Sequence, residues 1–203
     1  LFLSRAKRIR LLKKLALHDR LTGLSNWQAL DQHFQSLRSL DGWVYLLFSI
    51  PEFRRINNVF GNDVSLQFLR DITAVMKSSL SSEEIAARIS ENGFAMLLHG
   101  DELDGRINSI LERLHRIPLT DGNVVYDYLC SYCGCACQLT GEEKSLPRLN
   151  RIASAVMDSQ PAHHIVSWEW YDKTKSGRAE LQDSLIPELS RALRDHEFIP
   201  YFQ

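Results

Sequence analysis

Apolar residues follow two different periods along the chain, and the change from one to the other marks the secondary structure. Residues 43–50 form a continuous apolar run bounded by a glycine and a proline, which is typical of a buried strand. Residues 27–37 instead show helical spacing, and Ser25 or Asn26 can cap that helix. Residues 51–80 predict one short and one long helix, broken near a glycine.

The second half of the chain continues the alternation. Two short strands, 84–89 and 94–100, are joined by Ser90-Glu91-Asn92-Gly93, and Asn-Gly predicts a hairpin because both residues tolerate positive φ. The remaining pattern predicts a helix, a strand, a helix and a strand at 103–116, 124–139, 146–157 and 163–172. This order predicts an α/β (α+β) sheet covered by helices, with mostly antiparallel pairing.

Residues 1–17 combine an apolar stripe at helical spacing with a basic cluster. We interpret them as a signalling or linker helix, and their abrupt beginning suggests a fragment of a longer protein. Six basic residues form the cluster: Arg5, Lys7, Arg8, Arg10, Lys13 and Lys14. They could contact RNA or lipid headgroups, but a solvated helix face is the simpler explanation.

Composition limits the function classes. The 203 residues, 44% of them hydrophobic, suit one domain of about 150 residues plus flanking elements. A net charge of -1 gives no overall basic field for nucleic acid. Apolar runs are far shorter than the roughly 20 residues of a membrane span, so we expect no such span here.

Four cysteines lie within eight residues: Cys130, Cys133, Cys135 and Cys137. Buried, reduced thiols in a central strand are the simpler reading, and a structural zinc is the alternative. Ligands at alternate positions of an extended strand spread over about 13 Å, too far to share one metal. We therefore expect no metal here.

Several segments, in order, resemble the GGDEF (diguanylate cyclase) family. Asp19-x-Leu21-Thr22-Gly23-Leu24-x-Asn26 is similar to the family's opening D-x-L-T-G-L-x-N-R, although Trp27 replaces the arginine. Further matches are Phe53-Arg54, Ile56-Asn57, Phe60-Gly61, Leu69, Arg88-Ile-Ser-Glu-Asn-Gly-Phe94 in place of R-x-G-G-D-E-F, and Tyr132-Cys-Gly134-Cys-Ala136. Residues 185–203 resemble the opening of an EAL domain, where Phe202-Gln203 stands in place of Y-Q.

The resemblance implies a five-stranded sheet with helices on both sides, similar to the palm of nucleotide cyclases. It divides the chain into a linker helix at 1–17, a degenerate GGDEF domain at 18–173, and a linker helix with the first strand of an EAL domain at 174–203.

The resemblance also implies a site without its metal ligands. Active members hold magnesium with carboxylates that match Ser49 and Asn92 here, while Pro51 and Gly93 replace two further acidic positions. Ser90 and Glu91 replace the glycines that let phosphates approach, and Glu91 would repel a triphosphate. Glu52 and Glu91 each lie one position away from an acidic position of the family motif. On a strand, alternation would point their side chains away from the site. We expect neither catalysis nor tight Mg²⁺ or GTP binding.

Two residues of this sequence match positions that bind nucleotide in the family. Asn57 matches the asparagine that recognises guanine, although it could equally serve as a cap within a helical turn. Arg54 matches a phosphate contact. Other family positions are changed: the guanine aspartate is Leu66, and a late lysine and arginine are Gln160 and His164.

The family's inhibitory motif R-x-x-D falls on Ser81 and Glu84. Without the arginine, cyclic di-GMP lacks a bidentate clamp, so we expect feedback binding to be lost.

These features favour a regulatory and dimerisation domain that modulates an EAL domain in cis and dimerises through its N-terminal helix. Two alternatives stay open: a GTP sensor that does not turn over its ligand, and a protein or RNA adaptor. Nucleic acid is not the expected partner. The domain would be cytoplasmic, whether or not a membrane-anchored sensor precedes it.

Overall fold

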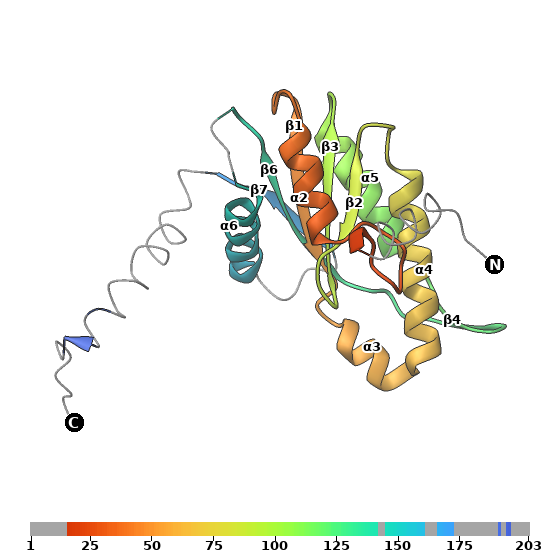
Figure 1. Ribbon diagram of the computed structural model, residues 1–203. Helices are drawn as coiled ribbons and strands as arrows, with labels where there is room; N and C mark the ends of the chain where they lie inside the picture. Colours follow the sequence, from red (N-terminus) through yellow and green to blue (C-terminus); the bar gives the residue numbers. More distant parts are fainter. Residues whose placement is uncertain (1–15, 142–144, 161–165, 173–190, 192–193, 196–203) are drawn as a thin grey trace, which may run out of the picture.

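The computed structural model describes residues 16–141, 145–160, 166–172, 191 and 194–195 (Figure 1). Most of the expected N-terminal helix, most of the segment 174–203, and His164 lie outside these residues, so the predictions that fall there stay predictions.

Most of the expected elements are present at nearly the expected bounds. The helices are α2 (Trp27–Ser36), α3 (Phe53–Phe60), α4 (Asn62–Ser78), α5 (Leu103–His115) and α6 (Leu146–Ser159). The strands are β1 (Trp43–Ser49), β2 (Ile85–Arg88), β3 (Gly93–His99), β4 (Leu119–Asp121), β5 (Val124–Tyr126), β6 (Tyr132–Gln138) and β7 (Val166–Trp170). Asn26 caps α2, because its Oδ1 accepts from the Ala29 backbone N–H at 3.0 Å.

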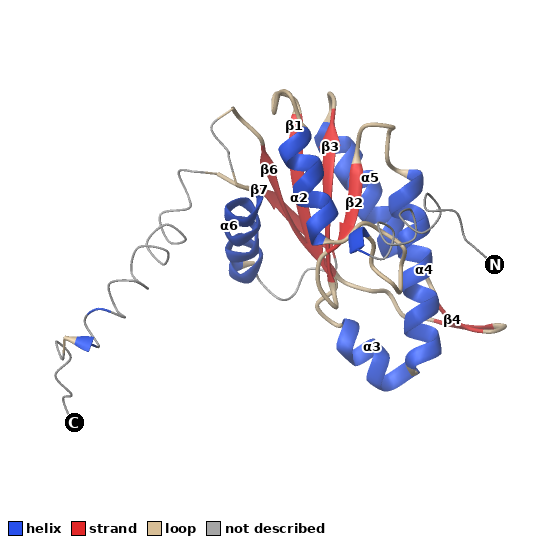
Figure 2. Ribbon diagram, viewed as in Figure 1, coloured by secondary structure: helices blue, strands red, loops and turns tan. Residues whose placement is uncertain are grey.

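Five strands form one sheet in the order β2-β3-β1-β6-β7 (Figure 2). β1 pairs antiparallel with β3 and β6, β2 pairs antiparallel with β3, and β6 pairs parallel with β7. The expected mixed, mainly antiparallel sheet is thus confirmed. Because β1 lies in the middle, it is buried along its length until it emerges at Ser49.

Helices cover both faces of this sheet, as expected. Alternate β1 residues Val44, Leu46 and Phe48 pack in a core with α3, α4 and α5. Tyr45 and Leu47 point the other way, into a core with α2 and α6. This alternation is the period-2 geometry of a strand buried on both faces.

The cysteines of β6 lie on the α6 side of the sheet. Cys135 and Cys137 are buried in the core with α2 and α6, which confirms the expected burial. Cys133 is half-buried near the end of α6, and Cys130, just before β6, is buried in the other core. Burial raises the pKa of the Cys130 thiol to about 12, so this thiol stays protonated at neutral pH.

The prediction of one strand over 124–139 was wrong. The chain forms a separate two-stranded hairpin, β4–β5, around Gly122 at φ +56°, before β6 begins at Tyr132. Tyr126 and Tyr128 pack on Phe60 of α3, with ring centroids 4.8 and 5.5 Å away. These contacts hold the intervening segment against α3, so it does not continue the main sheet.

No helix within the described part of the chain is both long enough and apolar enough to cross a bilayer.

Candidate functional site

The candidate site lies where β1 ends and the turn between β2 and β3 begins. Ser49 pairs with Gly93 in the antiparallel register of β1 and β3. The Ile50 N–H donates to the Asn92 carbonyl at 3.0 Å, and Asn92 Nδ2 donates to the Ile50 carbonyl at 3.2 Å. The fold therefore brings together the two positions, Ser49 and Asn92, that the sequence singled out.

The turn itself differs from the expected one. Gly93 belongs to β3, and among the described residues neither Asn92 nor Gly93 has a positive φ. A Cβ at Gly93 would lie 2.5 Å from Ser90 Oγ, so a larger residue at this position requires the Ser90 hydroxyl to move. The Ile89 and Ser90 N–H groups both donate to the Gly93 carbonyl, which closes the turn.

Arg88 connects this turn to the loop that precedes α2. Its buried guanidinium donates to the Glu91 carbonyl at 2.6 Å and lies 3.4 Å from Asp19 Oδ1. Burial opposes the charge of Asp19, but hydrogen bonds from Thr22 and the Arg88 charge outweigh it and lower the pKa of Asp19. The resemblance included Asp19 and Arg88 without suggesting that they form a pair.

A cavity of about 320 Å³ opens beside Ser49. Its charged lining residues are Glu52 and Asp158, and no lysine or arginine is among its described lining. The remaining lining is Pro51, Ser131, Tyr132, Cys133, Met157, Gln160 and Ser167. The charged side chains in the described lining of this cavity are therefore both acidic.

The expectation that Glu52 points away from the site was wrong. Glu52 lies in a turn after β1 and not on the strand, so strand alternation does not apply to it. Its Oε2 accepts from the Tyr128 hydroxyl at 2.7 Å, and its Oε1 lies 3.4 Å from Arg55. Burial, together with the neighbouring Glu52 carboxylate, raises the pKa of Tyr128 to about 12. No local sequence pattern predicts a contact between residues 76 positions apart.

Glu91 also faces the site, contrary to expectation. It lines a second cavity of about 230 Å³ with Pro51, Arg54 and Asn92, and its carboxylate lies 3.5 Å from Arg54 Nη2. Both side chains are mostly exposed, at 55% for Glu91 and 81% for Arg54, so water screens the pair. The guanidinium expected to contact phosphate has a carboxylate neighbour instead.

Two further matched positions have partners inside the chain. Asn57 Oδ1 accepts from the Ser65 hydroxyl at 2.9 Å, a contact that links α3 to α4. Gln160 holds the ends of β6 and β7 together: its Nε2 donates to the Gly134 carbonyl, and its Oε1 accepts from Cys133 Sγ and Ser167 Oγ.

The position of the inhibitory motif is built differently from the turn. Glu84 is buried, and its carboxylate accepts from the Ser81 and His99 N–H groups at 2.7 and 2.8 Å and from Arg106 of α5 at 2.6 Å. Burial disfavours the Glu84 charge, but these hydrogen bonds outweigh it and lower the pKa of Glu84. Ser81 contributes its backbone N–H, and no sequence motif marks Arg106 as the partner of Glu84.

The donor set at Ser49 and Asn92 does not fit magnesium. Mg²⁺ requires hard oxygen ligands and favours carboxylates, whereas these positions offer a hydroxyl and an amide whose nitrogen is bound to backbone. Within the described residues, no three His, Cys, Asp or Glu side chains come together as metal ligands.

Comparison with known proteins identifies the family to which the chain belongs. A family model described as "Diguanylate cyclase, GGDEF domain" matches residues 16–162. Over 91 residues the chain is 30% identical to the cyclic di-GMP phosphodiesterase NbdA of Pseudomonas aeruginosa, a match covering 42% of this chain and 12% of NbdA.

Solved structures show the same fold. The coiled coil and GGDEF domain of DgcB from Caulobacter crescentus, in complex with c-di-GMP, aligns with a TM-score of 0.69 at 17% identity, covering 80% of this chain and 91% of that one. The S helix-GGDEF-EAL structure of Vibrio cholerae LapD, bound to c-di-GMP, aligns with a TM-score of 0.65 at 17% identity, covering 97% of this chain and 47% of that one. Because the family model covers most of the domain and these structures share its sheet and helices, the chain belongs to the GGDEF family of cyclic di-GMP signalling proteins.

Proposed function

We propose that this GGDEF domain does not synthesise cyclic di-GMP and serves as a regulatory and dimerisation domain for an EAL domain in the same polypeptide. The observation that carries the proposal is the pairing of Ser49 with the 89–93 turn, which puts neutral side chains at both metal-ligand positions. Phosphoryl transfer depends on metal to gather phosphate charge, so this site lacks its main source of transition-state stabilisation.

The charge of the neighbouring cavity supports the same conclusion. Glu52 and Asp158 both line the space beside Ser49, and Glu91 lies beside Arg54. A GTP triphosphate would meet carboxylates here, with no lysine or arginine in the described lining of that cavity. The GTP-sensor alternative is therefore less favoured than a domain that acts without nucleotide.

Regulation of an EAL domain is supported by the sequence at 185–203, which resembles the start of such a domain. The GGDEF match with a protein named as a cyclic di-GMP phosphodiesterase agrees with this arrangement. Under this proposal the EAL domain hydrolyses or binds cyclic di-GMP, and the GGDEF domain transmits an upstream signal to it.

The first test is synthesis of cyclic di-GMP by the purified chain. We expect no product from millimolar GTP with Mg²⁺ or Mn²⁺, measured by chromatography, and no heat of GTP binding in calorimetry. Product formation would refute the inactivity. GTP binding without turnover would favour the sensor alternative.

A restoration experiment tests the physical reason. The double variant Ser49→Asp, Asn92→Asp returns two carboxylates to the paired positions, and we expect measurable Mn²⁺ binding by calorimetry. The matched control is Ser49→Asp, Ser90→Asp, which adds the same charge but moves one carboxylate to an exposed position of the same turn. Equal Mn²⁺ binding by both variants would show that net charge, and not the Ser49–Asn92 pairing, governs the site.

A further inference from the structure

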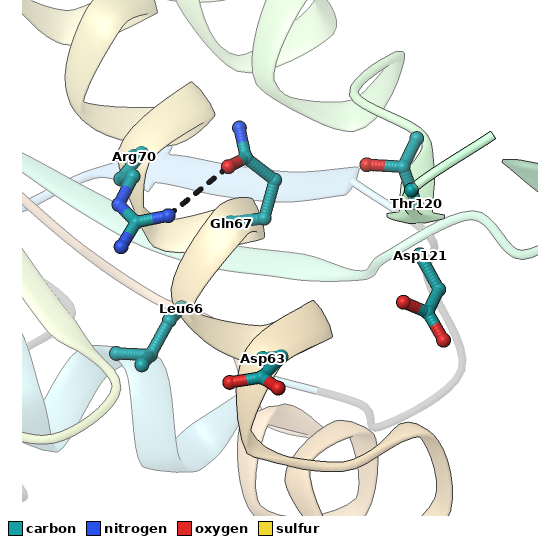
Figure 3. Close-up of a pocket in the computed structure, with 7 residues that line it drawn as sticks. Asp63, Leu66, Gln67, Arg70, Thr120 and Asp121 are labelled. Atoms are coloured by element: carbon teal, nitrogen blue, oxygen red, sulfur yellow. Dashed lines mark hydrogen bonds between the residues drawn. The ribbon is translucent and has the colours of Figure 1, made fainter. Parts of the chain in front are cut away.

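Two clefts of the described structure each contain a pair of carboxylates, and they differ in what opposes this charge. A polar cleft of about 440 Å³ lies between α4 and the β4–β5 hairpin, with Asp63 and Asp121 in its lining (Figure 3). Arg70 lines the same cleft and supplies a cation. Asp63 also lies in the first turn of α4, where the helix dipole favours a carboxylate. The negative charge of this cleft is therefore opposed within the domain itself.

The cavity of about 320 Å³ beside Ser49 has neither form of opposing charge. Its two carboxylates, Glu52 and Asp158, come from the turn after β1 and from the last turn of α6. A carboxylate in a last turn opposes the helix dipole, whose C-terminal end is negative, and α6 has no basic residue in that turn. The described lining also contains no lysine or arginine. Negative charge from two elements therefore meets at this cavity without a cation in its described lining.

Arg55 contacts Glu52 from outside the cavity. Its Nη1 lies 3.4 Å from Glu52 Oε1, but the Arg55 side chain is 69% exposed and does not line the cavity. Water screens a pair of this kind, so it offsets little of the charge inside. The other oxygen of the same carboxylate accepts from the Tyr128 hydroxyl at 2.7 Å, which is a neutral partner. Tyr128 therefore fixes the position of the Glu52 carboxylate without neutralising it.

The rest of the lining suits an organic cation better than a metal ion. Ser49 and Ser131 add hydroxyl oxygens, and neither side chain makes a hydrogen bond to another described residue. Pro51 and Met157 add apolar surface beside these acceptors. Within the described residues no three potential metal ligands come together, whereas the cavity volume falls in the range of roughly 300–1,000 Å³ typical of small-molecule pockets. Acceptors beside an apolar wall match N–H donors carried on a short alkyl chain.

We propose that the cavity beside Ser49 binds a guanidinium or primary ammonium group carried on a short alkyl chain. The N–H groups of this ligand donate to the Glu52 and Asp158 carboxylates, and its methylene groups contact Met157. Its positive charge also faces the negative end of α6. Such groups occur in free polyamines and in the lysine and arginine side chains of proteins. The proposal rests on the proposed function, because a cavity that holds a cation here does not hold the GTP triphosphate.

Titration of the complete 203-residue chain with agmatine, which carries a guanidinium and an ammonium group on one alkyl chain, tests the proposal. We expect saturable binding, measured by calorimetry and ligand-observed NMR, that weakens as NaCl rises because salt screens charge pairs. Tetramethylammonium has the charge but no N–H donor, so it should bind at least about tenfold more weakly. Agmatine that shows no saturation in either measurement at millimolar concentration would overturn the proposal.

Variants of the two carboxylates locate the site. Glu52→Gln and Asp158→Asn should each weaken agmatine binding about tenfold. Glutamine at position 52 can still accept from Tyr128, and position 158 is exposed, so neither change should prevent folding. Asp158→Lys should abolish binding and raise the urea midpoint, because it places a positive charge at the C-terminal end of α6.

The matched control removes the same charge from the other cleft. Asp63→Asn with Asp121→Asn takes two carboxylates from the cleft beside α4 and should leave agmatine binding unchanged. An equal loss of binding in this control would show that the net charge of the chain governs binding, and it would overturn the assignment to the cavity beside Ser49.

Competition experiments identify the source of the cation. If a blocked tripeptide with one arginine displaces agmatine at a lower concentration than agmatine itself requires, the ligand is a protein side chain; the reverse order assigns the site to a free amine. Displacement of agmatine by an equal concentration of GTP would overturn the proposal, because the site would then accept an anion. Cyclic di-GMP synthesis with normal agmatine binding would refute only the absence of catalysis, and a lack of agmatine binding without synthesis would refute only the cation site.

Discussion

Two regions depart from the GGDEF pattern, and the fold treats them in opposite ways. At the 89–93 turn the new charged contact, Glu91 with Arg54, lies in water. At the position of the inhibitory motif, Glu84 has no exposed side-chain surface and is held by Arg106 and two backbone N–H groups. Both sites have carboxylates beside arginines, so the difference lies in burial. The turn is closed by backbone hydrogen bonds and its charged pair is exposed, whereas the Glu84 side chain is buried.

The largest expected effect follows from removing the buried charge. Glu84→Ala leaves Arg106 and two N–H groups without their acceptor, which should lower the free energy of unfolding by about 3 kcal/mol. Urea denaturation measures this. The control Glu83→Ala removes the exposed neighbouring carboxylate and should change little. Equal losses in both variants would show that Glu84 contributes no more than a surface glutamate.

Acid should weaken the same region. The pKa of Glu84 is lowered in the folded state from its ordinary 4.5, so the unfolded chain binds more protons as the pH falls. The stabilisation from Glu84 is therefore present above about pH 5 and is lost as pH falls through the folded pKa. Asp19, whose pKa is also lowered, adds to this trend. Urea midpoints between pH 7 and about pH 3.5 should fall more steeply for wild type than for Glu84→Gln; parallel profiles would contradict the assignment.

A smaller loss is expected in the turn. Asn92→Ala removes the Nδ2 hydrogen bond to the Ile50 carbonyl, for a cost of about 1 kcal/mol. Asn92→Asp should lose the same bond, because its carboxylate cannot donate a proton to that carbonyl at neutral pH. Thermal or urea unfolding compares the two, and an unchanged midpoint in both would remove the structural role assigned to this amide.

The smallest effect should come from the exposed pair. Glu91→Gln and Arg54→Gln should each change the free energy of unfolding by less than about 0.5 kcal/mol, because water screens both charges. A double-mutant cycle measures their coupling. A coupling as large as that between Glu84 and Arg106 would erase the contrast between the two regions.

Local pattern was enough to predict most of the elements. The apolar run of β1, the break at Gly61 and the alternation that buries Cys135 and Cys137 all follow from short-range geometry. The absence of carboxylates at positions 49 and 92 is likewise a property of the sequence itself. The family's fold then implied that these positions meet, and the register of β1 with β3 confirms it.

Only the tertiary structure decided how the charged residues are used. Glu84 binds Arg106, which lies 22 positions later in the sequence, and Glu52 accepts a hydrogen bond from Tyr128, which lies 76 positions later. These contacts form because elements distant in sequence pack together. The hairpin that divides 124–139 depends equally on long-range packing of Tyr126 against Phe60. A carboxylate in the sequence specifies a charge, but its burial and its partners depend on the assembled fold, and these determine whether it stabilises the core or remains in water.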